Sequence, residues 1–193
     1  MPPDEGLALY EAGLEAGLVG PLLEIGSYCG KSATYLGEAA RERGTVLFSI
    51  DHHRGSEEMQ AGWEHHDPEV ADPATGVIDS LRFFRQTIAE AGLDETVIAV
   101  VGDSPRIAEH WATPLGLVFI DGAHSTEPAR ADYEGWEPKI VTRGFLAIHD
   151  VFADPSDGGQ GPFEIFERAV GSGMFEVTRS VGSLRVLLRL DAG

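Results

Sequence analysis

Five short apolar runs, each followed by a helical pattern, constrain the fold of this chain more than any other feature. The run "TVLFSI" at 45–50 is continuous and contains β-branched residues, which is typical of a strand covered on both faces of a sheet. Strands that alternate with helices favour parallel βα units. The predicted strands lie at about 21–25, 45–50, 96–101, 116–120 and 144–148.

Apolar residues at helical spacing precede the first predicted strand and lie between most of the later ones. Leu7, Tyr10, Leu14 and Leu18 repeat every three or four residues and predict a short leading helix. The other predicted helices lie at about 31–43, 81–91 and 103–111, from Pro128 to Trp136, and at 162–171.

The end of the chain has a different pattern. "MFEVTRSVGSLRVLLRL" at 174–190 alternates around the turn "VGS", which predicts a β-hairpin rather than another βα unit. We therefore predict an α/β fold: a doubly wound, mostly parallel sheet with helices on both faces and an antiparallel hairpin at the C-terminal edge. No repeat or linker interrupts residues 1–193, so we expect one domain.

The charge of the chain limits its partners. There are 14 Lys and Arg residues against 32 Asp and Glu residues, a formal net charge of −18. Nucleic acids and anionic membranes are disfavoured, because both need basic residues to neutralise phosphates. The single cysteine, Cys29, permits neither an intrachain disulfide nor a Cys-based zinc site. Neither a signal peptide nor an apolar run near ~18 residues is present, so we expect a cytoplasmic protein.

All five predicted strands end in polar residues. Ligands of open α/β sheets bind at the carboxyl ends of the strands. Caps and turns explain one or two such ends, because Asp and Gly are common there, but they explain five less well. The strand ends are Glu24–Gly26, Asp51–His53, Gly102–Ser104, Asp121–His124 and His149–Asp150.

The turn after the first predicted strand, "EIGSYCGKSA" at 24–33, separates two classes of cofactor. A dinucleotide site uses G-x-G-x-x-G, whose second glycine lets the backbone approach a pyrophosphate. Tyr28 occupies that position, which makes a dehydrogenase the poorest interpretation. S-Adenosylmethionine contains no phosphate and needs only one close approach, at Gly26. Asp51 suits the ribose hydroxyls or begins a turn, and Asp103 with Ser104 suits an adenine edge or a helix cap.

Three motifs resemble those of class I methyltransferases that use S-adenosylmethionine. "EIGSYCGKSA" resembles the first motif of the catechol O-methyltransferase group, and "VVGDS" resembles its adenine-side turn. "FIDGAHSTEPARADYEGWEPKIVTRGFLAIHDVF" is similar to the D-G-x-H…D…W…G-G…H-D pattern of a wider small-molecule group. The resemblance covers about 20–190 and implies a Rossmann-like fold of seven strands with a final hairpin.

The resemblance implies a role for each matched residue of the cofactor site. Glu24 would anchor the first turn, and Asp51 would hold the ribose. The full set of cofactor-binding residues that it implies is Glu24, Gly26, Ser27, Tyr28, Ser32, Asp51, Asp103, Ser104 and Asp121.

The implied metal site departs from the catechol enzymes. Those enzymes hold a metal with an Asp after the fourth strand and an Asp-Asn pair after the fifth. Asp121 matches the first position, but the pair here is His149-Asp150. The predicted ligands are therefore Asp121, His149 and Asp150, for Mg²⁺ or Mn²⁺. Because Mg²⁺ prefers oxygen ligands, either His149 stays outside the first shell, or the metal is softer, or no metal binds.

Two histidines are candidates for the catalytic base. The catechol enzymes carry a lysine base three residues after the first metal ligand, and His124 occupies that position here. Because a histidine pKa lies near ~6.5, His124 or His149 can accept a hydroxyl proton near neutral pH.

The segment 52–78 is long, polar and rich in Gly and Pro. Loops of this length are uncommon in compact domains unless they are functional or mobile. We expect it to be a solvated loop, a cover over the acceptor or a contact in a homo-oligomer. The residues that suggest a role are His52, His53, Trp63, His65 and His66.

These observations predict a methyltransferase that transfers a methyl group from S-adenosylmethionine to a hydroxyl of a small molecule, such as a sugar or a phenol. The alternative is a catalytically inactive nucleotide- or cofactor-binding protein with a regulatory or scaffold role. Asp121, His124, His149 and Asp150 speak against the alternative, because an inactive pocket does not need them.

Overall fold

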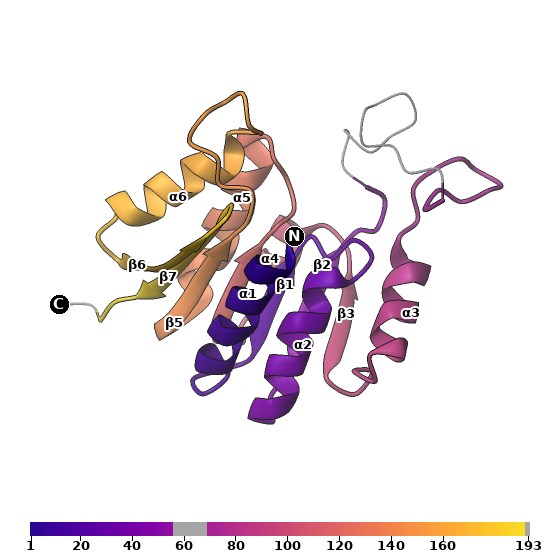
Figure 1. Cartoon of the computed structure of the whole chain (residues 1–193), viewed down its shortest axis with the longest axis horizontal. Coiled ribbons are helices and arrows are strands. Elements are labelled where there is room, and N and C mark those ends of the chain that lie inside the picture. Colours follow the sequence, from indigo (N-terminus) through magenta and orange to yellow (C-terminus); the bar gives the residue numbers. More distant parts are fainter. Residues whose placement is uncertain (56–68, 192–193) are drawn as a thin grey trace.

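The computed structural model describes residues 1–55 and 69–191 and shows a sheet of seven strands between two layers of helices (Figure 1). The strands are β1 (Leu22–Ile25), β2 (Leu47–Asp51), β3 (Val97–Val101), β4 (Leu115–Ile120), β5 (Ile140–Ile148), β6 (Phe175–Val181) and β7 (Leu184–Arg189). Their order is β3-β2-β1-β4-β5-β7-β6. The first five strands are parallel, and β7 pairs antiparallel with β5 and β6. This arrangement confirms the predicted fold class.

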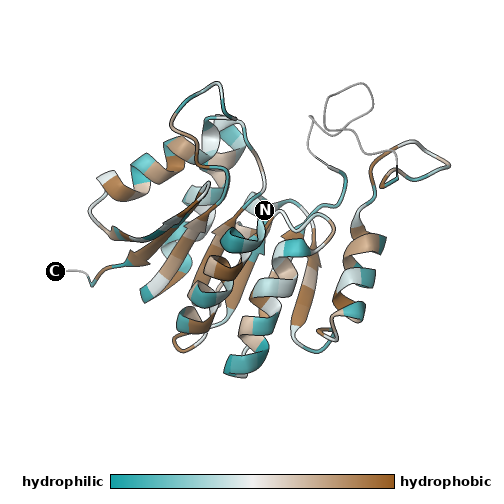
Figure 2. Ribbon diagram, viewed as in Figure 1, coloured by the Kyte–Doolittle hydropathy of each residue, from teal (hydrophilic) through white to brown (hydrophobic). Residues whose placement is uncertain are grey.

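Within residues 1–55 and 69–191, three α-helices cover each face of the sheet. The helices α1 (Pro3–Ala16), α2 (Lys31–Arg43) and α3 (Leu81–Glu90) pack on one face, and α4 (Ser104–Glu109), α5 (Thr126–Trp136) and α6 (Gly161–Gly171) pack on the other. Successive strand residues serve opposite faces: Leu22 packs with α1 and α2, and Leu23 packs with α5. The strands β1, β2 and β3 are accordingly mostly hydrophobic, whereas the helices carry hydrophilic residues as well (Figure 2).

The predicted leading helix is confirmed, and two of the four residues that predicted it, Tyr10 and Leu14, pack against the core. Leu7 and Leu18 are exposed, and α1 instead buries Glu5, Gly6, Ala8, Leu9, Ala12, Gly13 and Ala16. Gly13 lies close to Ala39 and Leu36 of α2, so the two helices approach through small residues. A carboxylate, Glu5, is therefore buried at the start of α1.

Several element boundaries differ from the prediction by one or two residues, and the start of the fifth strand differs by four. The strand predicted at 144–148 begins at Ile140, because the chain continues through an irregular register beside Leu115–Leu117 with Arg143 at a positive φ of 64°. The helix predicted to begin at Pro128 begins two residues earlier, at Thr126, which leaves the proline within the first turn. Neither of these two differences moves the carboxyl end of a strand.

The sheet order determines where a ligand can sit. From β1 the chain builds outward through β2 and β3 and then returns to β4 on the other side of β1. The carboxyl ends of β1 and β4 therefore flank the switch point of the sheet, where ligands of open α/β folds bind. In residues 1–55 and 69–191, no helix has the length and hydropathy needed to cross a membrane.

Candidate active site

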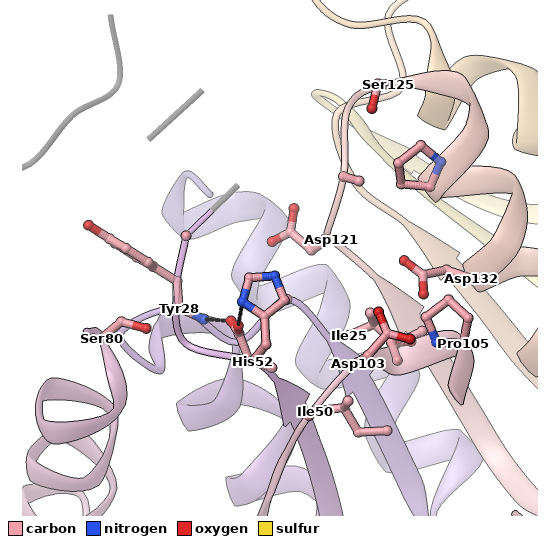
Figure 3. Close-up of a pocket in the computed structure, with 18 residues that line it drawn as sticks. Ile25, Tyr28, Ile50, His52, Ser80, Asp103, Pro105, Asp121, Ser125 and Asp132 are labelled. Atoms are coloured by element: carbon pink, nitrogen blue, oxygen red, sulfur yellow. Dashed lines mark hydrogen bonds and ion pairs between the residues drawn. The ribbon is translucent and has the colours of Figure 1, made fainter. Parts of the chain in front are cut away.

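A cavity of about 340 Å³ opens at the switch point (Figure 3). This volume lies in the range of small-molecule sites, roughly 300–1,000 Å³. The polar side chains that line the cavity include four carboxylates, and the lining residues in the described part of the chain include no Lys or Arg. The lining residues are Ile25, Gly26, Tyr28, Ile50, Asp51, His52, Gly55, Ser80, Gly102, Asp103, Ser104, Pro105, Asp121, Gly122, Ala123, Ser125, Pro128 and Asp132.

Asp51 is held rigidly at the end of β2. Its Oδ2 accepts a hydrogen bond from the backbone N–H of Tyr28 at 2.8 Å, and its Oδ1 accepts one from the backbone N–H of His53 at 2.7 Å. Both contacts use backbone groups, so they fix the carboxylate without neutralising it. Because each carboxylate oxygen has a second lone pair, Asp51 can still accept hydrogen bonds from a pair of hydroxyls.

Three residues predicted to bind the cofactor lie behind the first turn and do not line the cavity: Glu24, Ser27 and Ser32 are all buried. The Ser49 hydroxyl donates to Glu24 Oε1, and burial raises the pKa of Glu24 to about 7. Glu24 therefore sits inside the sheet, where it joins β1 to β2.

The side of the cavity next to β3 combines Asp103, Ser104 and a residue that was not predicted, Asp132. Asp103 caps α4 by accepting from the backbone N–H of Arg106 at 3.2 Å. The indole N–H of Trp136 donates to the Ser104 hydroxyl at 2.9 Å. Asp132 projects from α5 into the cavity (Figure 3). It is 5% exposed, its Oδ1 has no hydrogen-bond partner, and burial raises its pKa to about 6.

The three predicted metal ligands converge next to the cavity. His149 Nδ1 lies 3.0 Å from Asp121 Oδ1 and 3.2 Å from Asp150 Oδ1. One ligand atom from each of the three residues lies within 4.8 Å of the other two. Asp121 also lines the cavity, so the cluster and the cavity share a wall. This donor set, two carboxylates and an imidazole, suits a divalent cation.

The second nitrogen of His149 is also occupied. Its Nε2 lies 2.8 Å from Oε2 of Glu5, the buried carboxylate of α1. Burial opposes a charge on the ring, but the hydrogen bonds to Asp121, Asp150 and Glu5 outweigh it and raise the pKa of His149 to about 10. A ring with carboxylates at both nitrogens does not suit the predicted role of a base.

His124 has a different environment. Its Nε2 lies 3.1 Å from Asp150 Oδ2, and its side chain is 37% exposed. Burial acts to raise the pKa of Asp150, but the hydrogen bonds with His124 and His149 outweigh it and hold that pKa well below its usual range. Asp150 is thus a persistent anion that can orient His124 and stabilise its protonated form.

Backbone strain concentrates at this edge of the sheet. Among the described residues other than glycine, Tyr28, His53 and Asp150 adopt positive φ values of 44°, 57° and 55°. Arg143 is the fourth such residue, and it lies in β5. Such conformations persist where the surrounding structure fixes them, and they cluster at functional sites. Here they direct the backbone N–H groups of Tyr28 and His53 toward Asp51.

The long segment 52–78 is described at its two ends. His52 lines the cavity, whereas His53 is buried and its Nδ1 lies 2.8 Å from the Ser80 hydroxyl. At the other end, Ala71 forms a bridge with Ile78. Trp63, His65 and His66 lie outside the described residues.

Glu5 and Asp132 were missed from the sequence, although a signal exists for each. Asp132 shares the buried face of α5 with Ala129, Tyr133 and Trp136. Glu5 precedes Ala8, Leu9 and Ala12 at the same helical spacing. In both cases an acidic residue occupies a position that the helical period assigns to the core.

Comparisons with known proteins agree with this geometry. The family described as a methyltransferase domain matches residues 23–151, more than half of the chain. The O-methyltransferase TomG from Streptomyces achromogenes, solved with S-adenosylmethionine, is 18% identical and has a TM-score of 0.68 over 99% of this chain and 82% of its own. An O-methyltransferase from Bacillus cereus, solved with S-adenosylhomocysteine, is 18% identical, with a TM-score of 0.67 over 98% of this chain and 82% of its own. These similarities show a shared fold.

Proposed function

The chain belongs to the family of methyltransferase domains, and from that premise we propose that it transfers the methyl group of S-adenosylmethionine to a hydroxyl of a small molecule. The family match confirms the resemblance on which the sequence prediction of a methyltransferase was based. Two proteins of the same fold, TomG and the Bacillus cereus enzyme, are O-methyltransferases solved with this cofactor or its demethylated product.

The charge of the cavity is the observation that carries the proposal. Asp51, Asp103, Asp121 and Asp132 line it, and its described lining residues include one imidazole, that of His52, but no Lys or Arg. S-Adenosylmethionine brings a sulfonium and an ammonium group, so carboxylates favour it. The diphosphate of a dinucleotide would instead meet negative charge and the Tyr28 side chain. The cavity therefore supports a cationic nucleoside ligand.

The strand ends give the cofactor an orientation. Asp51, fixed by two backbone N–H groups, would accept hydrogen bonds from the ribose hydroxyls. Asp103 and Ser104 would then flank the adenine, as predicted from the sequence. Gly26 and Tyr28 lie on the side of the first turn, where the methionine part would sit, and Ser27 and Ser32 support that turn from behind. This orientation would direct the methyl group toward Asp121.

Methyl transfer to a hydroxyl requires loss of a proton. We assign that proton to the imidazole of His124, and Asp150 at 3.1 Å would stabilise the resulting positive charge. The acceptor oxygen attacks the methyl carbon, the carbon–sulfur bond breaks, and its electron pair stays on sulfur to give S-adenosylhomocysteine.

The cluster of Asp121, His149 and Asp150 fits a divalent cation by its donor chemistry. A cation held there would lower the pKa of the acceptor hydroxyl and orient it. The acceptor belongs to a class small enough to enter beside Asp121, such as a sugar or a phenol.

Calorimetric titration with S-adenosylhomocysteine tests the proposal, with NADH as the comparison ligand. Micromolar binding of the first and none of the second is expected. A screen of phenols and sugars with labelled S-adenosylmethionine then tests transfer. Binding without transfer to any hydroxyl acceptor would favour the inactive cofactor-binding alternative. Absence of S-adenosylhomocysteine binding would refute the proposed methyl transfer.

A further inference from the structure

Glu5 connects the first helix to the cluster of Asp121, His149 and Asp150 across 144 positions of the sequence. Its side chain is 2% exposed. Its Oε2 lies 2.8 Å from His149 Nε2, and its Oε1 accepts hydrogen bonds from the backbone N–H and the hydroxyl of Ser183 at 2.6 and 3.0 Å. A buried carboxylate is costly unless it is paired, and here it meets three donors. The two donors of Ser183 hold Oε1, so Oε2 faces His149 Nε2.

This contact determines how His149 presents its other nitrogen. An ionised carboxylate only accepts hydrogen bonds, so Nε2 carries a hydrogen. Nδ1 then points at Asp121 Oδ1 and Asp150 Oδ1. Two arrangements satisfy those oxygens: either Nδ1 carries a second hydrogen, or Nδ1 and the two carboxylates bind a cation together.

The two separations from His149 Nδ1 to the carboxylate oxygens fit neighbouring ligands of one cation. Neighbouring ligands of a six-coordinate ion with bonds of about 2.1 Å lie about 3.0 Å apart. His149 Nδ1 is 3.0 Å from the Asp121 oxygen and 3.2 Å from the Asp150 oxygen. A metal-bound histidine commonly donates its other N–H to a carboxylate, which fixes the ring and raises its basicity. Glu5 occupies that outer position.

We propose that Glu5 is a positioning residue that holds His149 with Nδ1 directed at Asp121 and Asp150, so that the three bind a first-row transition metal ion in preference to Mg²⁺. The preference follows from the nitrogen ligand, because Mg²⁺ favours oxygen whereas Mn²⁺, Fe²⁺ and Co²⁺ accept imidazole more readily. The inference rests on the proposed methyl-transfer site, whose acceptor the metal would meet at Asp121.

Metal binding can be measured without turnover. We would titrate the metal-stripped full chain with Mn²⁺ by electron paramagnetic resonance, with Co²⁺ by visible absorption, and with Mg²⁺ by competition. The variants are Glu5→Gln, which removes the anion, and His149→Asp, which supplies a third oxygen ligand. Glu11→Gln, at an exposed position of the same helix, is the matched control.

The wild type is expected to bind Mn²⁺ and Co²⁺ at least about 10-fold more tightly than Mg²⁺. Glu5→Gln should weaken Mn²⁺ binding by about 10- to 100-fold and change the Co²⁺ spectrum, while Glu11→Gln changes neither. His149→Asp should remove most of the preference over Mg²⁺.

Several outcomes overturn the inference. If S-adenosylhomocysteine binds but neither Mn²⁺ nor Co²⁺ does, His149 is an internal cation and the metal inference fails while the proposed function stands. If a folded Glu5→Gln variant keeps its Mn²⁺ affinity and Co²⁺ spectrum, Glu5 has only a structural role. If the wild type does not bind S-adenosylhomocysteine, the proposed function is rejected instead.

Discussion

The carboxylate of Asp51 accepts the backbone N–H of Tyr28 across the ends of two neighbouring strands, at 2.8 Å. Tyr28 adopts a positive φ of 44° in making this contact. The end of β2 therefore fixes the shape of the turn after β1, and the residue assigned to the ribose also supports the turn assigned to the methionine part of the cofactor. Cofactor binding should therefore depend on Asp51 both through the ribose and through the shape of the turn.

Replacing Asp51 should weaken cofactor binding. Asp51→Ala removes the acceptor of two backbone N–H groups and of the ribose hydroxyls, and a hydrogen bond to a charged group contributes about 1.5–3 kcal/mol. We expect the dissociation constant for S-adenosylhomocysteine, measured by calorimetry, to rise by about 10- to 100-fold. Asp94→Ala, at an exposed position outside the cavity, serves as the control. Equal affinities in the two variants would remove Asp51 from the site.

Much of the candidate site could be predicted because parallel strands present their carboxyl ends at one edge. Asp51, Asp103 and Asp121 each follow an apolar run in the sequence, and the sheet brings all three to one cavity. Helical and strand periods therefore sufficed for the fold class and for these positions.

Other features depend on packing that periodicity does not encode. The spacing of Leu7 and Leu18 predicted α1 but not its buried face, which is set by close approach to α2 through small residues. Once that face is known, Glu5 lies inside and reaches His149. Glu5 and His149 are 144 positions apart, and no pattern in the sequence indicates that they meet.

His124 should affect transfer and leave cofactor binding unchanged. General-base catalysis contributes about 10²- to 10⁴-fold, so His124→Ala should slow methyl transfer by that factor. The affinity for S-adenosylhomocysteine should stay within about twofold, because His124 does not line the cavity. The methyl-transfer rate of the wild type, measured from pH 5 to 9, should rise with the ionisation of a single base, and this rise should be absent from the His124→Ala variant. His110→Ala, at an exposed position, is the control, and unchanged turnover of the His124 variant would exclude His124 as the base.

Asp132 is expected to contribute to cofactor affinity although it was not among the predicted cofactor-binding residues. Its carboxyl group projects into the cavity, and its Oδ1 has no hydrogen-bond partner. A ligand group that donates to this carboxyl would contribute about 1 kcal/mol or more. Asp132→Ala should raise the dissociation constant for S-adenosylhomocysteine by about 10-fold, whereas Asp132→Asn, which keeps an acceptor oxygen, should lose less. Calorimetry on both variants decides, and equal effects would show that the acceptor oxygen is unimportant.

Glu24 should make the stability of the protein depend on pH. Burial raises its pKa from 4.5 to about 7, so the folded state holds the proton more tightly than the unfolded state. The contribution of Glu24 to the free energy of unfolding is full below pH 4.5 and is lost as the pH rises through 7. By linkage, the free energy of unfolding falls by about 3 kcal/mol over this range. Urea denaturation from pH 4 to 8 should show this decrease in the wild type and a flatter profile in Glu24→Gln. Parallel profiles for the two proteins would contradict the assignment.

Gly26 should tolerate no side chain. Comparison with a second glycine, Gly44, separates the cost of the backbone conformation from the cost of the steric overlap. Both Gly26 and Gly44 have positive φ, 87° and 65°. A Cβ at Gly26 would overlap the carbonyl oxygen of Asp121, whereas a Cβ at Gly44 would meet nothing within 4 Å. Gly44→Ala should therefore cost only the left-handed conformation, about 1–2 kcal/mol, and Gly26→Ala should cost several kcal/mol in urea denaturation. Similar losses of stability in the two variants would mean that β1 and β4 can separate at the switch point. If the Gly26→Ala protein still bound S-adenosylhomocysteine, the close approach of Gly26 to the Asp121 carbonyl would serve the fold rather than the ligand.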